Sequence, residues 1–280
     1  MSRVFKWLGV ALGGLLALAF VAYLAMYLIS ERRFGRTYDV APLAVTRSTD
    51  SLAATRGERL ARLSGCFGCH GPDLRGSVFY DEPGVARIVA PNLTQVVAGA
   101  SDGQLARAIV RGVRVDGSGV FSMPSPMFYH LSDAALGDLL AFLRTLTPAP
   151  DTLPPTKLRP LGRLGLVAGL YQSLTGTIDT TVPRPAMTPD GPPQVLGRYL
   201  ALTSCSECHG QDLNGDSASA VPNLAIVQSY AAGDFAKLLR TGVPLGGRKL
   251  DLMEDVALGR FAHFTDDEVA GLYAYLHAEH

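Results

Sequence analysis

The chain has 280 residues, of which 48% are hydrophobic and 18% are charged, and its formal net charge at pH 7 is zero. A neutral chain lacks the excess of basic residues that nucleic-acid-binding surfaces use, so no nucleic-acid partner is predicted. Glycine and proline are frequent, with 30 and 18 residues, and strand-like alternation is scarce. This composition favours small helical domains with long loops.

An uncharged apolar run covers residues 7–29 and has basic residues on both sides. A helix needs about 20 apolar residues to cross the hydrocarbon core of a bilayer. A cleavable signal peptide has a shorter apolar core of about 7–15 residues, although small residues near the end of this run leave cleavage open. Residues 1–33 are therefore predicted to form a transmembrane anchor, and residues 34–50 a spacer.

Helical patterns and capping residues then outline a first domain over residues 51–147. Ser101, with Gln104 three residues later, is typical of a capping box at a helix start, and Ser132 is predicted to cap the last helix. The segment between the first helices and Ser101 contains Pro91-Asn92-Leu93, within a stretch interpreted as a loop.

Residues 148–192 are rich in proline, which predicts an extended and semi-rigid connector. An apolar stretch at 161–174 interrupts it. This stretch is too short to span a bilayer and fits a packed or interfacial helix. The helix is expected either to brace the two flanking domains against each other or to rest on the first domain alone.

The second half, residues 193–280, repeats the features of the first in the same order, which predicts one domain used twice. Thr265 is expected to cap the last helix as Ser132 does. The other matched pairs are Pro91 with Pro222, Arg111 with Arg240, and Met123 with Met253.

Each half also carries one Cys-x-x-Cys-His sequence, and the two together use all four cysteines. This is the pattern for covalent attachment of c-type haem. Thiols two residues apart lie on one helical turn, where each can form a thioether, and the histidine that follows can bind iron. Two covalently bound c-type haems are predicted, with thiols from Cys66, Cys69, Cys205 and Cys208 and iron ligands from His70 and His209.

Other uses of the cysteines fit less well. A zinc site built from two Cys-x-x-Cys pairs expects them about 15–20 residues apart, whereas the second pair begins only at Cys205. Disulfides within each pair would leave both adjacent histidines unexplained. Zinc and disulfides remain as the minor alternatives.

The ordered set of C-x-x-C-H, P-N-L and a lone methionine before a terminal helix resembles class I cytochromes c in both halves. The resemblance implies a mainly α fold, with the N-terminal transmembrane helix followed by two tandem class I cytochrome c domains. It also implies that the carbonyls of Pro91 and Pro222 accept hydrogen bonds from His70 and His209. Such an acceptor fixes the imidazole ring and raises its basicity towards iron.

The second axial ligand is predicted to be Met123 in the first domain and Met253 in the second, because methionine pairs with histidine in cytochromes c. Met127 is an alternative to Met123, and an ordinary core role is open for each methionine. Arg111 and Arg240 suit haem propionates or solvated helix ends. The alternative iron ligands are His130, His263, His277 and His280. Of these, His263 and His277 are expected in surface or packing roles instead.

The resemblance implies an electron carrier with no catalytic residues of its own. It would relay single electrons between a respiratory or dehydrogenase complex and a second redox partner. Proteins of this kind acquire haem outside the cytoplasm, so the anchor is expected in the inner (cytoplasmic) membrane with the haem domains on the periplasmic side. The alternatives are a dihaem peroxidase with one open iron site and a haem-based redox or gas sensor.

Overall fold

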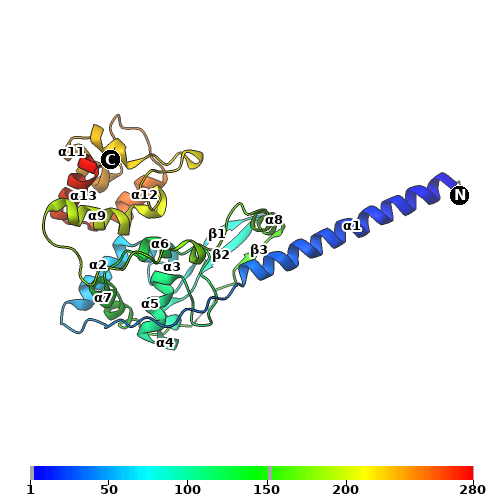
Figure 1. Cartoon of the computed structure of the whole chain (residues 1–280), viewed down its shortest axis with the longest axis horizontal. Coiled ribbons are helices and arrows are strands. Elements are labelled where there is room, and N and C mark those ends of the chain that lie inside the picture. The colour runs from blue at the N-terminus through cyan, green and yellow to red at the C-terminus, as the bar shows by residue number, and fades with distance from the viewer. Residues whose placement is uncertain (1–2, 151–152, 280) are drawn as a thin grey trace.

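A long N-terminal helix projects from two helical units in the computed structural model, which describes residues 3–150 and 153–279 (Figure 1). This helix, α1, spans Arg3–Phe34 and its apolar stretch is not buried against the rest of the chain. At 1.5 Å rise per residue it is longer than the roughly 30 Å core of a bilayer. Its length and composition suit a membrane span or a signal sequence, and among the described residues no other helix has this character.

The first unit contains six helices around one apolar core. Its first helix, α2, crosses its last helix, α7, so closely that a Cβ atom on Gly57 would overlap the Asp138 carbonyl oxygen. The predicted caps are confirmed: Ser101 and Gln104 form a capping box, and the Ser132 hydroxyl accepts from the Ala135 N–H. The helices are α2 (Ala53–Leu63), α3 (Cys66–His70), α4 (Leu93–Gly99), α5 (Asp102–Arg111), α6 (Ser125–Phe128) and α7 (Asp133–Leu143).

The stretch between His70 and Pro91 differs from the loop expected there. Strands β1 (Ser77–Glu82) and β2 (Ala86–Ala90) form an antiparallel hairpin, and β3 (Lys157–Leu158) from the connector pairs with β2. Because β1 is largely exposed on both faces, it lacks the apolar alternation by which a half-buried strand is recognised. The pairing of β2 with β3 joins residues about seventy positions apart in the chain.

The second unit repeats the first in its helix crossing and its last cap. A Cβ atom on Gly197, in its first helix, would overlap the Gly271 carbonyl oxygen in its last helix. Thr265 and Glu268 form the expected reciprocal cap of that last helix. The elements are α9 (Pro193–Ser204), α10 (Ser206–His209), η2 (Ser217–Ser219), η3 (Leu224–Ser229), α11 (Ala232–Thr241), α12 (Leu252–Gly259), η4 (Phe261–His263) and α13 (Asp266–Glu279).

The connector helix α8 (Pro160–Ala168) does not brace the two units, which corrects one of the two sequence expectations. It packs on the sheet of the first unit and on the end of α1 (Figure 1). Arg163 donates to the Ser30 hydroxyl at 2.8 Å, pairs with Glu31 at 2.6 Å and lies over the Tyr27 ring. Beyond α8, the turn η1 (Leu174–Thr177) and the following extended chain run along the first unit. The connector therefore rests on the first unit and fastens α1 to it.

Replacing Arg163 by alanine should loosen the junction between α1 and α8, because the side chain that joins Ser30 and Glu31 to the connector is lost. We expect trypsin to release the anchor from detergent-solubilised protein several-fold faster, by cleavage after Arg32, Arg33 or Arg36. Lys157→Ala, which removes an exposed cation from β3, is the matched control. Equal cleavage rates in the two variants would contradict the role given to Arg163.

The two units contact each other directly, through equivalent elements used in both directions. Helix α2 of the first unit lies against η4 of the second, and α9 of the second lies against α6 of the first. Arg59 donates to the His263 carbonyl and pairs with Glu268, whereas the Tyr199 hydroxyl accepts from the Ser132 N–H. Each unit therefore supplies its first helix to the cap region of the other unit's last helix.

Candidate functional site

The first Cys-x-x-Cys-His sequence forms one short helix, α3, bounded by two glycines. Gly65 before it and Gly71 after it have φ angles of 75° and 81°, a region that glycine adopts without the steric cost of a Cβ atom. Cys66 is half-buried and Cys69 is exposed, and neither is in a disulfide. The local chain therefore presents both thiols from a single helical turn.

The imidazole of His70 is buried, with only 8% of its surface exposed. Its Nδ1 lies 2.9 Å from the Pro91 carbonyl oxygen, and because a carbonyl can only accept, Nδ1 carries the proton. Burial lowers the pKa of His70, although the bond to Pro91 opposes this shift. A neutral ring with Nδ1 engaged leaves Nε2 as the nitrogen available to a metal.

The second motif has the same construction, although its histidine is more open. Helix α10 ends at His209, whose Nδ1 lies 2.8 Å from the Pro222 carbonyl oxygen. Burial again lowers the pKa of this histidine. The proline follows the histidine by 21 residues in the first unit and by 13 in the second, so the same contact is made despite different loops.

Each predicted methionine lies beside the core of its own motif. Met123 and Cys66 are half-buried against the core of the first unit, and Met253 and Cys205 against that of the second. Met127, the alternative to Met123, is 1% exposed within the first core. The surroundings of the two candidates differ, since Met253 lies in the first turn of α12 whereas Met123 lies in the irregular segment before α6.

The two arginines expected to be equivalent have different partners. The Arg111 guanidinium lies 5.0 Å from the centre of the Tyr129 ring, and its Nε is buried with no hydrogen-bond partner among the described residues. Arg240 instead donates to three carbonyls around η4 and pairs with Asp266 at 2.8 Å. An unpaired buried donor suits a haem propionate, so Arg111 fits that role. Arg240 is already engaged by protein groups, and its propionate role stays a prediction.

Three of the other candidate histidines have contacts of their own. His130 bonds to Gln211 of the second unit, the carbonyl of His263 accepts from Arg59, and the His277 ring lies 4.9 Å from that of Tyr273. His280 lies outside the described residues. Among the described residues there is no cluster of three or more His, Cys, Asp or Glu side chains that could hold a bare metal ion.

One residue near both motifs was not among the sequence candidates. Burial raises the pKa of the Cys66 and Cys205 thiols to about 12, and the positive charge of Arg260 acts against this rise. Burial and the Glu207 carboxylate raise the pKa of Cys69 and of Cys208, and the charge of Arg260 again acts against this rise. Arg260 thus acts on all four thiols, which belong to two different units. The residues next to Arg260 in the sequence do not indicate this role, because its side chain contacts distant parts of the chain.

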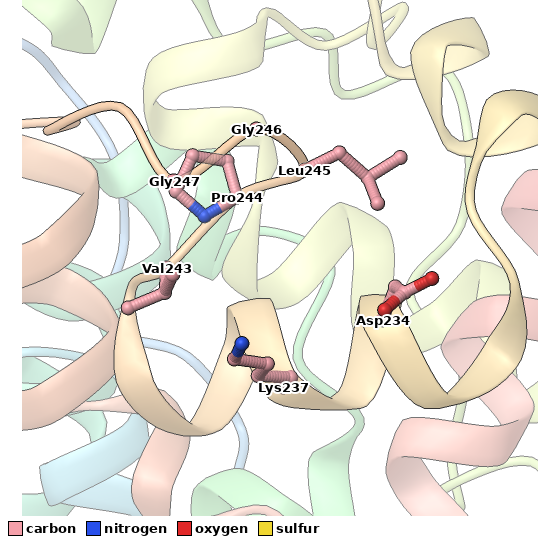
Figure 2. A pocket seen from close by; sticks show the side chains of 7 residues that line it. All are labelled: Asp234, Lys237, Val243, Pro244, Leu245, Gly246 and Gly247. Atoms are coloured by element: carbon pink, nitrogen blue, oxygen red, sulfur yellow. The ribbon is translucent and has the colours of Figure 1, made fainter.

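A surface pocket of about 190 Å³ lies in the second unit between α11 and the loop that leads towards α12. Figure 2 shows Asp234 and Lys237 on α11 beneath the loop Val243–Gly247. None of these residues belongs to the predicted haem-binding set. The structure therefore keeps the cysteines, histidines and methionines separate from this pocket.

The donor set fits a covalently attached haem. Free thiols lie on one helical turn, a neutral imidazole is oriented by a carbonyl, and a half-buried thioether lies beside the same core. The sequence profile of the cytochrome c family matches residues 54–147. Residues 54–147 form a cytochrome c domain. Its cofactor class is c-type haem, and the mainly helical fold expected from the sequence is confirmed.

Relatives extend the likeness beyond this cytochrome c domain. A protein described as "Diheme cytochrome c-type" from Cereibacter sphaeroides is 26% identical, over 80% of this chain and 84% of that protein. The "Alcohol dehydrogenase (quinone), cytochrome c subunit" of Gluconobacter oxydans is 29% identical, over 59% of this chain. The match covers only 37% of that subunit. These likenesses support electron transfer by a cytochrome.

Proposed function

We propose that the chain is a membrane-anchored dihaem c-type cytochrome that relays single electrons between a respiratory or dehydrogenase complex and a second redox partner. The observation that carries the proposal is the repeat of one contact, from the motif histidine to the proline carbonyl, at His70–Pro91 and at His209–Pro222. The second contact supports residues 193–280 as a second cytochrome c domain, beside the first at 51–147. The connector over 148–192 joins them.

Different residues of the chain would attach each haem, orient its histidine ligand and neutralise its propionate. The thiols of Cys66 and Cys69, or of Cys205 and Cys208, attach the haem, which supplies one-electron chemistry when bound. The carbonyls of the two prolines hold each histidine ring with Nε2 directed away from the backbone. Arg111, which is half-buried and has a buried Nε without a partner among the described residues, would neutralise a propionate in the first domain.

A methionine sulfur would supply the remaining protein ligand to each iron. Met123 and Met253 are the candidates, since each lies beside the core that also packs its motif. A filled axial position leaves no site for peroxide or a gas. This arrangement favours a carrier over the peroxidase and sensor alternatives.

Substituting Met123 by leucine should halve the near-infrared methionine-to-iron charge-transfer absorption and lower one of the two midpoint potentials, because methionine ligation raises the potential. Met253→Leu should do the same to the other haem. The control is Met127→Leu, which keeps an apolar side chain at a fully buried site. Loss of the absorption in Met127→Leu, with Met123→Leu unchanged, would reassign the first ligand.

The anchor would place both domains at the periplasmic face of the inner membrane. Helix α1 supplies a span of sufficient length, and α8 fastens its end to the first unit. The relative from Gluconobacter oxydans is a cytochrome subunit of a quinone alcohol dehydrogenase, which favours a dehydrogenase as the partner of this chain.

Two measurements test the proposal. A pyridine haemochrome assay on the membrane-purified chain should find two haems per polypeptide, and purification in mild detergent should recover a membrane oxidoreductase or dehydrogenase. Fewer than two haems would contradict the dihaem assignment. Carbon monoxide binding to the reduced protein would show an open axial position and favour the enzyme or sensor alternatives.

A further inference from the structure

We propose that Arg260 is a positioning residue shared by both haem sites, which with Glu207 holds the two attachment motifs together and whose charge sets both reduction potentials. The inference rests on the proposed dihaem function. It assigns a role to two residues that lie outside the ligand set, at the boundary between the two units.

Arg260 belongs to the second unit, between α12 and η4, but its side chain extends into the first. Its Nε donates to the Leu63 carbonyl oxygen at 3.1 Å, across 197 residues of sequence. The Cζ atom lies 3.0 Å from where a Cβ atom on Gly65 would stand. Gly65 immediately precedes Cys66, so the guanidinium lies against the start of the first motif.

The other side of the same guanidinium reaches the second motif. Nη1 lies 2.7 Å from Oε2 of Glu207, and Glu207 stands between Cys205 and Cys208. A single planar group therefore touches the residue before one motif and a residue inside the other. Gly65 and Glu207 therefore both lie against the same guanidinium group.

The environment of Arg260 strengthens its electrostatic effect. Its side chain is only 15% exposed, and Nη2 is buried with no hydrogen-bond partner among the described residues. A buried donor without a partner costs free energy, which a role in packing alone would not explain. A charge withdrawn from water also acts more strongly on its neighbours. A cation at this position destabilises ferric iron relative to ferrous iron, whereas the Glu207 carboxylate does the opposite.

The first unit has no residue equivalent to Arg260, although the two units are repeats. Arg260 stands five residues before Thr265, and the residue five before Ser132 is Met127. Met127 is packed in the core of the first unit. The symmetric contacts of Arg59 and Tyr199 explain how the units associate without Arg260. The first unit therefore has no counterpart of Arg260, and this one cation, paired with Glu207, acts on both haems at once.

The test is a redox titration, followed spectroscopically, of the full-length holoprotein in detergent. Arg260→Gln should lower both midpoint potentials, with the equilibrium constant for reduction falling at least threefold, which is about 28 mV at 59 mV per tenfold change for one electron. Glu207→Gln should raise both. Arg260→Lys keeps the positive charge but loses the planar guanidinium group. It should leave both midpoint potentials unchanged and lower the Tm of the protein.

The matched control is Arg198→Gln, which removes an exposed cation from α9 of the same unit and should leave both potentials unchanged. A shift confined to one haem, or shifts of the same sign in Arg260→Gln and Glu207→Gln, would overturn the proposal. If Arg260→Gln does not retain haem, the test uses the other two variants. Glu207→Gln must then raise both midpoint potentials, and Arg260→Lys must leave both unchanged. A haemochrome value below two in the unaltered chain would instead count against the dihaem function itself.

Discussion

Replacing Cys205 and Cys208 together by alanine is expected to halve the covalently bound haem, leaving one group per chain. Each motif has its own thiols, histidine and proline carbonyl, and the His70–Pro91 contact involves the first unit alone. The first site should therefore mature without the second. Intact mass and pyridine haemochrome measurements on the purified variant count the haem that remains.

The reciprocal variant, Cys66→Ala with Cys69→Ala, is the matched control and should retain only the haem of the second unit. The two variants should differ in midpoint potential because the two haem-binding histidines differ in burial, His70 being buried and His209 only partly so. Complete loss of haem in either variant would show that the two sites are not independent, and would contradict the two-domain organisation. Unchanged haem content would exclude thioether attachment at the altered motif.

Alanine at Gly57 is expected to destabilise the first unit strongly. The new Cβ atom would overlap the Asp138 carbonyl oxygen and lie 2.8 Å from the Phe142 Cβ, so α2 and α7 must separate. Overpacking of this kind costs roughly 3 kcal/mol at the upper end of its usual range. That value corresponds to a fall of about 12–24 °C in Tm for a domain of this size.

Gly197→Ala should have the same effect on the second unit, where α9 crosses α13. Gly99→Ala and Gly233→Ala are the matched controls, because a Cβ atom at either helical position meets nothing within 4 Å. Alanine there should be neutral or stabilising by up to about 1 kcal/mol. Differential scanning calorimetry of the four holoproteins makes the comparison, and equal Tm values across all four would contradict the close crossings.

Much of the site follows from local sequence. The cysteines, the histidine and the capping residues Ser101, Ser132 and Thr265 act within about five residues of themselves, so their spacing is visible in the chain. The P-N-L segments were paired with the histidines through the resemblance, and the structure places Pro91 and Pro222 within hydrogen-bond distance of them. The assignment of the axial methionines stays a prediction until the proposed spectra are measured.

Long-range contacts explain what the sequence expectations did not distinguish. Arg111 and Arg240 stand at matching positions, yet one has a free buried donor and the other is engaged by η4 and Asp266. The difference arises from the loops that precede the last helix, which are not alike in the two units. The hairpin β1–β2 was interpreted as a loop because its outer strand is exposed and its third partner comes from the connector.

The cofactor chemistry, the helical character of the cytochrome c domain and the long apolar helix can all be predicted from the sequence, because each depends on residues close together in the chain. The contact of α8 with the end of α1, and that of Arg260 with both motifs, are seen only in the folded chain. These contacts join residues separated by 133 and 197 positions. No local pattern records such pairs, since they form only when the packed units bring distant segments to the same place.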